Sequence, residues 1–453
     1  MNFRTLEMWR QMRGNLALAT KRGRLGVIDI GTSKITCLVL KLDQERAAEA
    51  LAGSGAVDRL SASLFGAVEV VGARCVQAHG IRRGEIVDMN AAARAIRSAL
   101  LAAERMAAPK VERVDHVIVG FSGGRPESFS TVGDVETETG RVSERDIANA
   151  LAAAEDPPIG EGRQILHAQP VEIGLDYQTG ITDPRGMMGR KLSVAVHVVA
   201  VDARPLANLM ECVRQCDLDI AGVVSAPYAS GLAALVEDEQ RTGALAIDMG
   251  AGTTQCSVFL RDHLVCVDGV RLGGAHVTTD IAAGLMMGEA EAERLKTLHG
   301  GCIATGADNR EPIEAPRRGE EDSPEPRTIS RGMLIGVIRP RMEETLRQLR
   351  DRLVALGVTD MPACSIVLTG NASQMPGVDE LVTRILGRRP RIGRPMRLAG
   401  LPQALSGPEG AAAVGLAIYA MRPHDEIWDF EAPRPWSVQG RAQDIVRWFK
   451  TSW

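Results

Sequence analysis

Apolar runs of strand length alternate with segments of helical period along most of the chain, a pattern typical of mixed α/β folds. The runs at 25–28 and 244–247 predict buried strands, and each is followed at once by a turn that opens with an acid, Asp29 or Asp248. Apolar residues repeat at helical spacing over 90–106, which predicts a helix in the first half. The two similar starts indicate two α/β lobes within one chain.

The segment 111–192 differs in character from the lobes around it. It contains a predicted strand at 117–119 and a helix that Ser143 starts, with Asp146 three residues further on in the spacing of a capping box. A run of turn residues lies near its end. We therefore expect an inserted subdomain here, with a strand at 194–201 resuming the first lobe.

The second half becomes more helical after its acid-led turn. A long helix is predicted over 333–356, followed by a strand at 364–368 and a turn at 369–372. Before that helix, residues 307–327 are rich in Pro, Glu and Arg, which predicts a mobile loop or a loosely formed hairpin.

Both acid-led turns, 29–34 and 248–254, have the composition of a phosphate-binding hairpin. Glycines let backbone N–H groups approach phosphate oxygens, hydroxyl groups donate to those oxygens, and an acid faces a hydrated divalent cation. A single turn of this kind is most often a plain hairpin, but two that open similar halves indicate two lobes closing on one nucleotide. The predicted contacts are Gly31, Thr32, Ser33, Lys34, Gly250, Gly252, Thr253 and Thr254 to the nucleotide, and Asp29 and Asp248 through water to Mg²⁺.

Two further features follow the second turn. Glu293 and Lys296 lie three residues apart on one face of a predicted helix. They form either a surface ion pair, which would contribute little to stability, or a pair that faces ribose and adenine. The turn formed by Gly370, Asn371 and Ala372 is also predicted to lie against the nucleoside.

Composition narrows the class without changing this picture. The 453 residues are 45% apolar and 24% charged, values typical of a soluble globular protein with more than one domain. A net charge of −4 gives no overall attraction to nucleic acid, although residues 1–24 are basic and are expected to form a solvated arm. The eight cysteines, none in a C-x-x-C pair, are interpreted as reduced packing residues of a cytoplasmic protein, and no apolar segment is long enough to cross a membrane.

The C-terminal segment 440–453 follows a proline-rich linker and has the pattern of an amphipathic helix. Four of the five tryptophans lie beyond residue 427, which favours an interfacial anchor over core packing. The segment suits the headgroup region of a membrane; the alternative is a helix docked on its own domain. Apolar residues of the basic arm, among them Trp9 and Met12, suggest a second membrane contact. The predicted lipid contacts are Ile445, Val446, Trp448, Phe449 and Trp453 on the apolar face, with Arg447 and Lys450 reaching anionic lipid.

The order of these elements resembles the FtsA family of bacterial cell-division proteins, within the actin superfamily. The resemblance runs over nearly the whole chain, 25–421. It implies an α/β fold of two actin-like lobes, with a relocated subdomain called 1C and a C-terminal amphipathic membrane-targeting helix. Its most specific pieces are 26–34, 169–172, 176–181, 227–233, 278–282 and the last interlobe helix at 411–417.

The resemblance also implies named parts along the chain. Subdomains 1A and 2A each come in two pieces because another subdomain interrupts them. The expected parts are an arm at 1–24, subdomain 1A at 25–110 and 193–240, 1C at 111–192, 2A at 241–274 and 331–400, 2B at 275–330, an interlobe helix at 401–421, a linker at 422–439 and the membrane helix at 440–453.

On the same resemblance, the protein binds ATP with Mg²⁺, polymerises at the cytoplasmic face of the cell membrane and tethers FtsZ filaments there. Subdomain 1C is implied to contact neighbouring subunits and later division proteins. The family motif at 338–344 makes Arg341 the candidate contact for the C-terminal tail of FtsZ, against the alternative of a solvated helix arginine. A small-molecule kinase of the same superfold and a pilus-assembly actin homologue stay open as alternatives, and neither needs the tryptophan-rich helix.

Two positions depart from the superfamily pattern. Asn371 stands where the adenosine turn commonly has glycine, and Asn tolerates a positive φ better than other residues. Ala226 stands before Pro227 where relatives such as MreB have a glutamate that orients the attacking water. Without that group, hydrolysis loses much of its help from geometry. We therefore expect a tight nucleotide site with slow or negligible ATPase activity.

Overall fold

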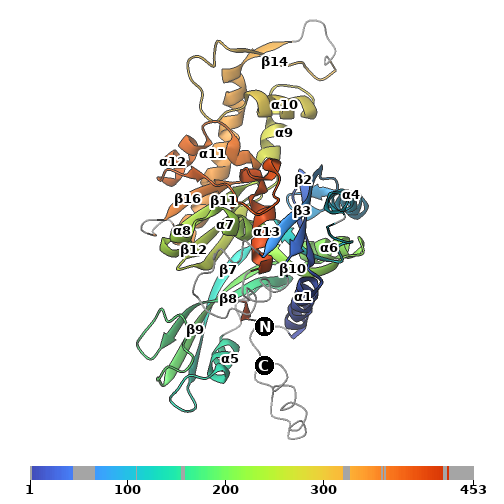
Figure 1. The fold of residues 1–453 in the computed structure, drawn as a ribbon. Coiled ribbons are helices and arrows are strands. Elements are labelled where there is room, and N and C mark those ends of the chain that lie inside the picture. Colours follow the sequence, from blue (N-terminus) through green and yellow to red (C-terminus); the bar gives the residue numbers. More distant parts are fainter. Residues whose placement is uncertain are drawn as a thin grey trace.

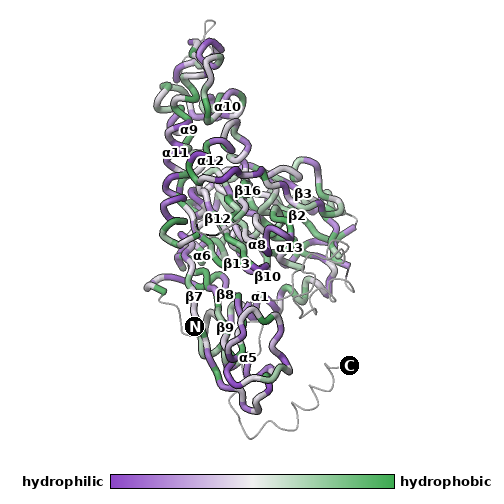
Figure 2. The backbone as a smooth tube through the Cα atoms, turned by 90° about the vertical axis from the view of Figure 1, so that its left-hand side faces the viewer, coloured by the Kyte–Doolittle hydropathy of each residue, from purple (hydrophilic) through white to green (hydrophobic). Residues whose placement is uncertain are grey.

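Two five-stranded sheets of the same topology form the body of the protein (Figure 1). The structure is a computed structural model that describes residues 3–43, 67–108, 110–154, 159–319, 327–358, 361, 364–421 and 426–427. The central strands of both sheets carry buried hydrophobic residues, among them Ile28 on β1 and Ile247 on β11, and Figure 2 shows hydrophobic segments within the body. The expected α/β architecture with two similar halves is confirmed.

The first sheet has the strand order β10-β6-β1-β2-β3. β1 runs antiparallel to β2 and parallel to β6, and β6 runs parallel to β10. The predicted helix at 90–106 is present as α4 and packs against β2 and β3 through its buried alanines. The elements of this lobe are β1 (Arg24–Ile30), β2 (Lys34–Leu42), β3 (Val68–Gln77), β4 (Ile81–Arg82), β5 (Glu85–Ile86), α4 (Met89–Ala107), β6 (His116–Phe121), α6 (Ala203–Arg214), β10 (Asp219–Ser225) and α7 (Ala226–Ala234).

The second sheet repeats this plan in the order β13-β12-β11-β16-β17, with β11 antiparallel to β12 and parallel to β16. Residues 307–327 contain one half of a short antiparallel hairpin, β14 with β15, as one of the two expectations had it. The elements are α8 (Glu237–Thr242), β11 (Ala244–Met249), β12 (Thr254–Leu260), β13 (His263–Val270), α9 (Gly274–Gly284), α10 (Glu289–His299), β14 (Pro312–Glu314), β15 (Thr328–Ser330), α11 (Arg331–Ala355), β16 (Ser365–Thr369), η2 (Asn371–Gln374), α12 (Val378–Leu386), β17 (Arg391–Ile392), η3 (Gln403–Leu405) and η4 (Pro408–Gly410).

Helices α7 and α13 (Ala411–Met421) lie between the two sheets and join them (Figure 1). α7 contacts β11 and β12, and α13 contacts β1 and β6. The two helices touch backbone to backbone, because a Cβ placed on Gly415 would lie 1.7 Å from the carbonyl oxygen of Ala229. Only glycine fits there. One hydrophobic cluster therefore runs from the first sheet through both helices into the second sheet.

The inserted subdomain is a three-stranded sheet, β7-β9-β8, with α5 (Glu144–Ala153) against it. Its strands are β7 (Glu127–Glu136), β8 (Arg163–Leu175) and β9 (Lys191–Asp202). The predicted capping box of Ser143 with Asp146 is confirmed, since the Asp146 carboxylate accepts from the Ser143 amide at 2.8 Å and the Asp146 amide donates to the Ser143 hydroxyl at 3.3 Å.

Two strands lie in different sheets from those expected. The strand predicted at 194–201 does not resume the first lobe; it is β9, the central strand of the insert, paired with β7 on one side and β8 on the other. Its apolar run resembles a central strand of the body because α5 and β13 pack against it. The strand predicted at 117–119 is β6, which belongs to the first sheet and not to the inserted subdomain.

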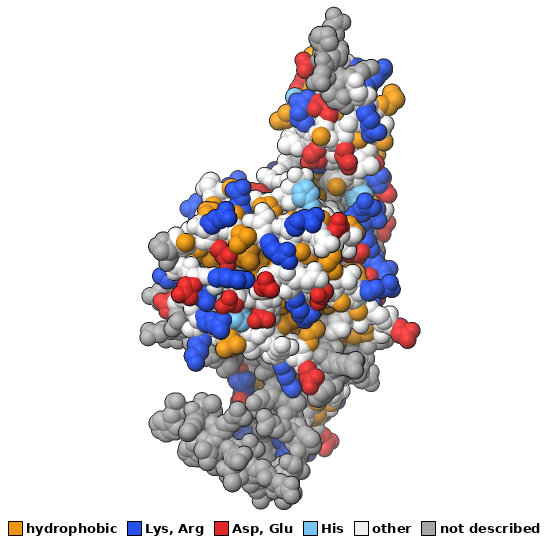
Figure 3. Space-filling view, turned by 90° about the vertical axis from the view of Figure 1, so that its right-hand side faces the viewer, with side chains coloured by type: hydrophobic (Ala, Val, Ile, Leu, Met, Phe, Trp, Pro, Cys, Tyr) orange, Lys and Arg blue, Asp and Glu red, His pale blue; other side chains and the backbone are white. Residues whose placement is uncertain are grey.

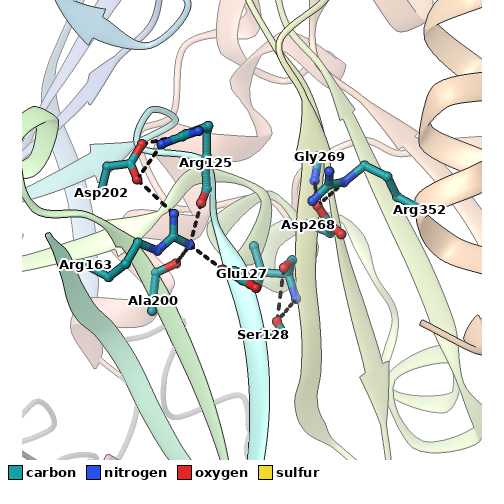
Figure 4. A network of polar contacts seen from close by, with 10 residues as sticks. Arg125, Glu127, Ser128, Arg163, Ala200, Asp202, Asp268, Gly269 and Arg352 are labelled. Carbon is teal, nitrogen blue, oxygen red and sulfur yellow. Dashed lines mark hydrogen bonds and ion pairs between the residues drawn. The ribbon is translucent and has the colours of Figure 1, made fainter. Parts of the chain in front are cut away.

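The insert also contacts the second lobe directly, at Ser128 (Figure 4). The Ser128 hydroxyl donates to the carbonyl of Val267 at 3.0 Å and accepts from the amide of Val267 at 2.8 Å. Its one hydrogen is thereby used, so Nε2 of His197, 3.0 Å away, is the donor of the third bond. Burial and the neighbouring His167 lower the pKa of His197 to about 3, which keeps this imidazole neutral. On the edge beside it, Arg125 and Arg163 both bind Asp202, at 2.7 and 2.9 Å.

The basic N-terminal residues form a helix, α1 (Phe3–Arg22), and not the solvated arm that was expected. α1 packs on β10 and β1, with Trp9 3% and Met12 4% exposed. The arginines hid an apolar stripe of helical period, because Trp9, Met12, Leu16 and Ala19 share one face. The suggested second membrane contact through Trp9 and Met12 is therefore wrong for these two side chains, which lie in the core.

Most of the cysteines are buried packing residues, as the sequence predicted. Each cysteine is a free thiol, and Cys75 alone of them is exposed. Among the described residues no helix has the length and apolarity needed to cross a membrane, and no cluster of His, Cys, Asp or Glu could hold a metal by itself. On the face seen in Figure 3, basic and acidic side chains are interspersed.

If α1 is part of the core, Trp9→Ala should lower the free energy of unfolding by about 3–5 kcal/mol, the usual cost of removing a buried large side chain. Leu18→Ala on the exposed side of the same helix should change it by less than about 0.5 kcal/mol. Chemical denaturation followed by circular dichroism measures both. If both variants lost only a small and equal free energy of unfolding, α1 would not be part of the core.

Candidate functional site

The two acid-led turns are hairpins of one geometry. In the first, the amide of Gly31 donates to the carbonyl of Lys34 at 3.0 Å, and in the second the amide of Gly250 donates to the carbonyl of Thr253 at 2.9 Å. Each joins the first two antiparallel strands of its sheet, β1 to β2 and β11 to β12. The local prediction of two equivalent turns is confirmed.

The turns meet across the two lobes. A Cβ on Gly252 would lie 2.3 Å from Oγ1 of Thr32 and 2.8 Å from Cα of Arg83. The Thr32 hydroxyl also accepts from the amide of Gly84 at 3.0 Å. Residues remote in the chain therefore form one surface, and the absence of a side chain at Gly252 allows the lobes to approach this closely.

The carboxylates of Asp29 and Asp248 lie close enough to repel each other. Burial and, after it, the charge of Asp29 raise the pKa of Asp248 to about 6. Burial also raises the pKa of Asp29, and Lys34 opposes this. Hydroxyls of Ser230 and Thr369 donate to the two oxygens of Asp248 at 3.2 and 3.4 Å. Two acids held in this way beside glycine-rich turns fit a hydrated divalent cation, because oxygen ligands suit Mg²⁺.

Lys296 does more than form a surface ion pair with Glu293. Its Nζ donates to the carbonyl of Gly274 at 3.1 Å, to the hydroxyl of Thr278 at 2.8 Å and to the carboxylate of Glu293 at 2.5 Å. The Lys296 side chain is 13% exposed and that of Glu293 is 54% exposed. A Cβ on Gly274 would lie 3.6 Å from the Cβ of Ala372 and 3.7 Å from Nζ of Lys296, so Lys296 and the turn at Ala372 reach the same glycine.

The turn after β16 also reaches the acids. Gly370 has φ +80°, and a Cβ on it would lie 2.5 Å from Oδ1 of Asp248. The residue with positive φ is Gly370 and not Asn371, which begins η2. The expectation that Asn371 replaces glycine at positive φ is therefore wrong, since the turn is completed one residue earlier.

Sequence reasoning missed the short hairpin β4–β5, which brings Arg83 to this site. Arg83 has φ +53° and is flanked by Gly80 and Gly84, both at positive φ. Two glycines four residues apart in a polar stretch are a turn signal that would have marked it. The carbonyl of Glu409, which accepts from Nζ of Lys34 at 3.0 Å, left no comparable signal.

Arg341 does not lie at this site. It binds Asp280 on α9 through two bonds of 2.6 and 3.0 Å and Glu344 through one of 2.6 Å. These bonds raise its pKa. Arg341 is thus an organised, partly exposed group between α9 and α11, and its contact with a partner stays a prediction. The predicted lipid contacts at 445–450 and Trp453 lie outside the described residues.

Comparison with known proteins decides the family. A family described as cell division protein FtsA matches residues 245–415, and the SHS2 domain inserted in FtsA matches 123–200, from just before β7 into β9. The cell division protein FtsA of Agrobacterium fabrum is 40% identical over 439 residues, 96% of each chain. The chain belongs to the FtsA family. The FtsA of Pseudomonas aeruginosa is 30% identical, with 88% of this chain and 89% of that one covered.

A solved structure supports the fold. The PilM–PilN type IV pilus biogenesis complex contains a chain that matches with a TM-score of 0.58 and 18% identity, covering 89% of this chain and 100% of that one. At this identity the likeness concerns the fold alone. The FtsA-family assignment and the actin-like fold expected from the sequence are both confirmed, and the homologues support a role in cell division.

The two acids should weaken the empty protein. Because burial and Asp29 make the Asp248 carboxyl harder to ionise in the folded chain than in the unfolded one, its ionisation costs stability. The cost grows as the pH rises from the ordinary carboxyl range and is complete above about 6. In EDTA without nucleotide, Asp248→Asn should raise the free energy of unfolding near neutral pH by about 1–3 kcal/mol. The gain should shrink as the pH falls toward the ordinary carboxyl range.

Urea denaturation across this pH range measures the effect, with the exposed Asp183→Asn as the matched control. A gain that is the same at every pH would mean that neither burial nor the charge of Asp29 raises the pKa of Asp248 in the folded protein.

Proposed function

We propose that this chain is an ATP-binding cell-division protein that polymerises at the cytoplasmic face of the membrane and tethers FtsZ filaments to it through its C-terminal helix. The observation that carries the nucleotide part is the meeting of two phosphate-type turns at Gly252 and Thr32, with Asp29 and Asp248 beside them. The family supplies the role in division.

The site residues fall into three roles. Backbone amides and hydroxyls of the turns 29–34 and 248–254 would bind the phosphates, and Asp29 and Asp248 would hold Mg²⁺ through water. Mg²⁺, when bound, neutralises part of the phosphate charge. Lys296 with its partner Glu293, and the turn at 370–372, would bind the nucleoside, since Lys296 and Ala372 both reach Gly274.

Slow hydrolysis is proposed from Ala226. This residue is buried at the first position of α7 and has only a methyl group to offer an attacking water. A group that orients the water supplies much of the catalysis in enzymes of this kind. ATP binding would then close the lobes into a shape suited to polymerisation, with little turnover.

Membrane attachment would depend on the polymer. Partial burial of five apolar side chains in the segment 440–453 would contribute about 1–2 kcal/mol each, less the cost of ordering the helix. One copy would bind weakly and reversibly. Linking copies in a filament raises the avidity by about 10²–10⁴-fold, so filaments would stay where single subunits leave.

The partner surfaces are proposed from the family resemblance. Arg341, held by Asp280 and Glu344, would present its remaining exposed edge to the C-terminal tail of FtsZ. The inserted subdomain would contact neighbouring subunits and later division proteins. A small-molecule kinase is less favoured because it would not need the tryptophan-rich segment 440–453. A pilus-assembly protein is less favoured because the likeness to the pilus complex extends to the fold only.

Mg-ATP at one hundred times its dissociation constant should stabilise the protein by about 2.7 kcal/mol. Asp29→Asn and Asp248→Asn should each lose the part of this gain that depends on Mg²⁺, while Asp183→Asn keeps it. Thermal unfolding with Mg-ATP and with ATP in EDTA measures the difference.

Turnover of ATP should stay below about one per second, under the ordinary enzyme range. A faster rate would refute the proposed role of Ala226.

Vesicles of phosphatidylglycerol and phosphatidylcholine should carry the protein and a labelled FtsZ tail peptide together in a flotation assay. Removal of residues 440–453 should leave peptide binding intact but keep both in the unfloated fraction. Arg341→Glu should float without the peptide, and Arg347→Glu on the same helix should behave as the unaltered protein. Flotation of the shortened chain would contradict the proposed membrane anchor. Binding of the peptide by Arg341→Glu would contradict the proposed FtsZ contact.

A further inference from the structure

A buried carboxylate follows the last helix of the body. Glu426 is 1% exposed and lies against the inserted subdomain, although α13 ends at Met421. Its Oε1 accepts from Nδ1 of His167 at 2.9 Å and from Nε2 of Gln169 at 3.1 Å, and its Oε2 accepts from the amide of Ala168 at 2.7 Å. Three consecutive residues of β8 thus direct donors at one carboxylate.

The surrounding bonds fix the protonation of His167. The amide of Ser225, at the end of β10, donates to Nε2 of His167 at 3.0 Å. That nitrogen must be an acceptor, so the proton is on Nδ1 and is donated to Glu426. The Gln169 amide nitrogen uses its second hydrogen for the Tyr228 hydroxyl on α7, at 3.1 Å.

The contact joins three parts of the protein. His167 and Gln169 belong to the insert, Ser225 and Tyr228 to the first lobe, and Glu426 to the part of the chain that follows α13. Tyr228 and Tyr419 pack edge-on against the His167 ring, with centroids 5.2 and 6.2 Å away. The bonds are therefore shielded from water. Hydrogen bonds to a charged group contribute most in such surroundings.

We infer that His167, Ala168 and Gln169 form a docking site for the part of the chain that follows α13, and that Glu426 is the group that occupies it. Glu426 then links the residues that follow it in the chain to the inserted subdomain. A force applied to residues 428–453 would be transmitted through Glu426 to β8. This inference depends neither on nucleotide binding nor on membrane binding.

Only a carboxylate satisfies this site. A glutamine at position 426 would have to turn its NH₂ group either toward the Ala168 amide or toward the Nδ1–H of His167. Both are donors, and the imidazole cannot exchange its tautomer without opposing the Ser225 amide. Glu426→Gln, which keeps the volume, should therefore unseat the segment almost as well as Glu426→Ala.

Hydrogen exchange of the full-length chain tests this. In Glu426→Gln the exchange of the Ala168 amide should rise about tenfold or more, the effect of losing a bond to a charged acceptor, and the peptide holding Glu426 and Ile427 should exchange faster. Peptides of β11 and β12 should not change. Glu211→Gln, at an exposed site on α6, is the matched control and should equal the unaltered protein.

Two results would overturn the inference. If the exchange rates of Glu426→Gln equal those of the unaltered protein, the docking site does not need a carboxylate. This holds whether or not Glu426→Ala exchanges faster. If exchange rises equally in the second lobe, Glu426 contributes to general stability and not to a local docking site.

Discussion

The contact between α7 and α13 is the constraint on which the arrangement of the two lobes depends. With no side chain at Gly415, α13 lies directly on the carbonyl of Ala229. Gly231 leaves similar room for the ring of Phe259 from β12, because a Cβ on this glycine would lie 2.4 Å from the ring. The helix pair thereby fixes the ends of β1 and β11 opposite each other. Asp29 and Asp248 converge because their strands occupy equivalent places in two sheets built alike.

Local features of this fold could be predicted from the sequence. The turns at 29–34 and 248–254, the helix α4 and the capping box of Ser143 depend on neighbouring residues, and the structure contains all of them. The FtsA resemblance then supplied the order of the lobes, which periodicity alone does not give.

Features that depend on distant contacts were not predictable in this way. The stripe of Trp9 and Met12 was concealed by arginines, and β9 has the apolar run of a body strand although it pairs within the insert. Arg83 reaches the site from a turn that its glycines could have marked, and Glu409 reaches it from η4, but neither sequence has a phosphate-binding pattern. Glu426 is one acid among many until the fold brings β8 beside it. In each case the deciding neighbour lies remote in the chain.

The bond pair between Ser128 and Val267 has a consequence for how the lobes can move. The insert is covalently part of the first lobe, yet this hydroxyl binds both backbone groups of a residue on β13. The two halves are thus joined at a second point, away from the phosphate turns. The two lobes therefore cannot rotate apart about α7 and α13 without a further change. Either the bonds between Ser128 and Val267 break, or the whole insert moves with the second lobe. In the second case a small rotation at α7 and α13 becomes a larger displacement at the outer end of the insert.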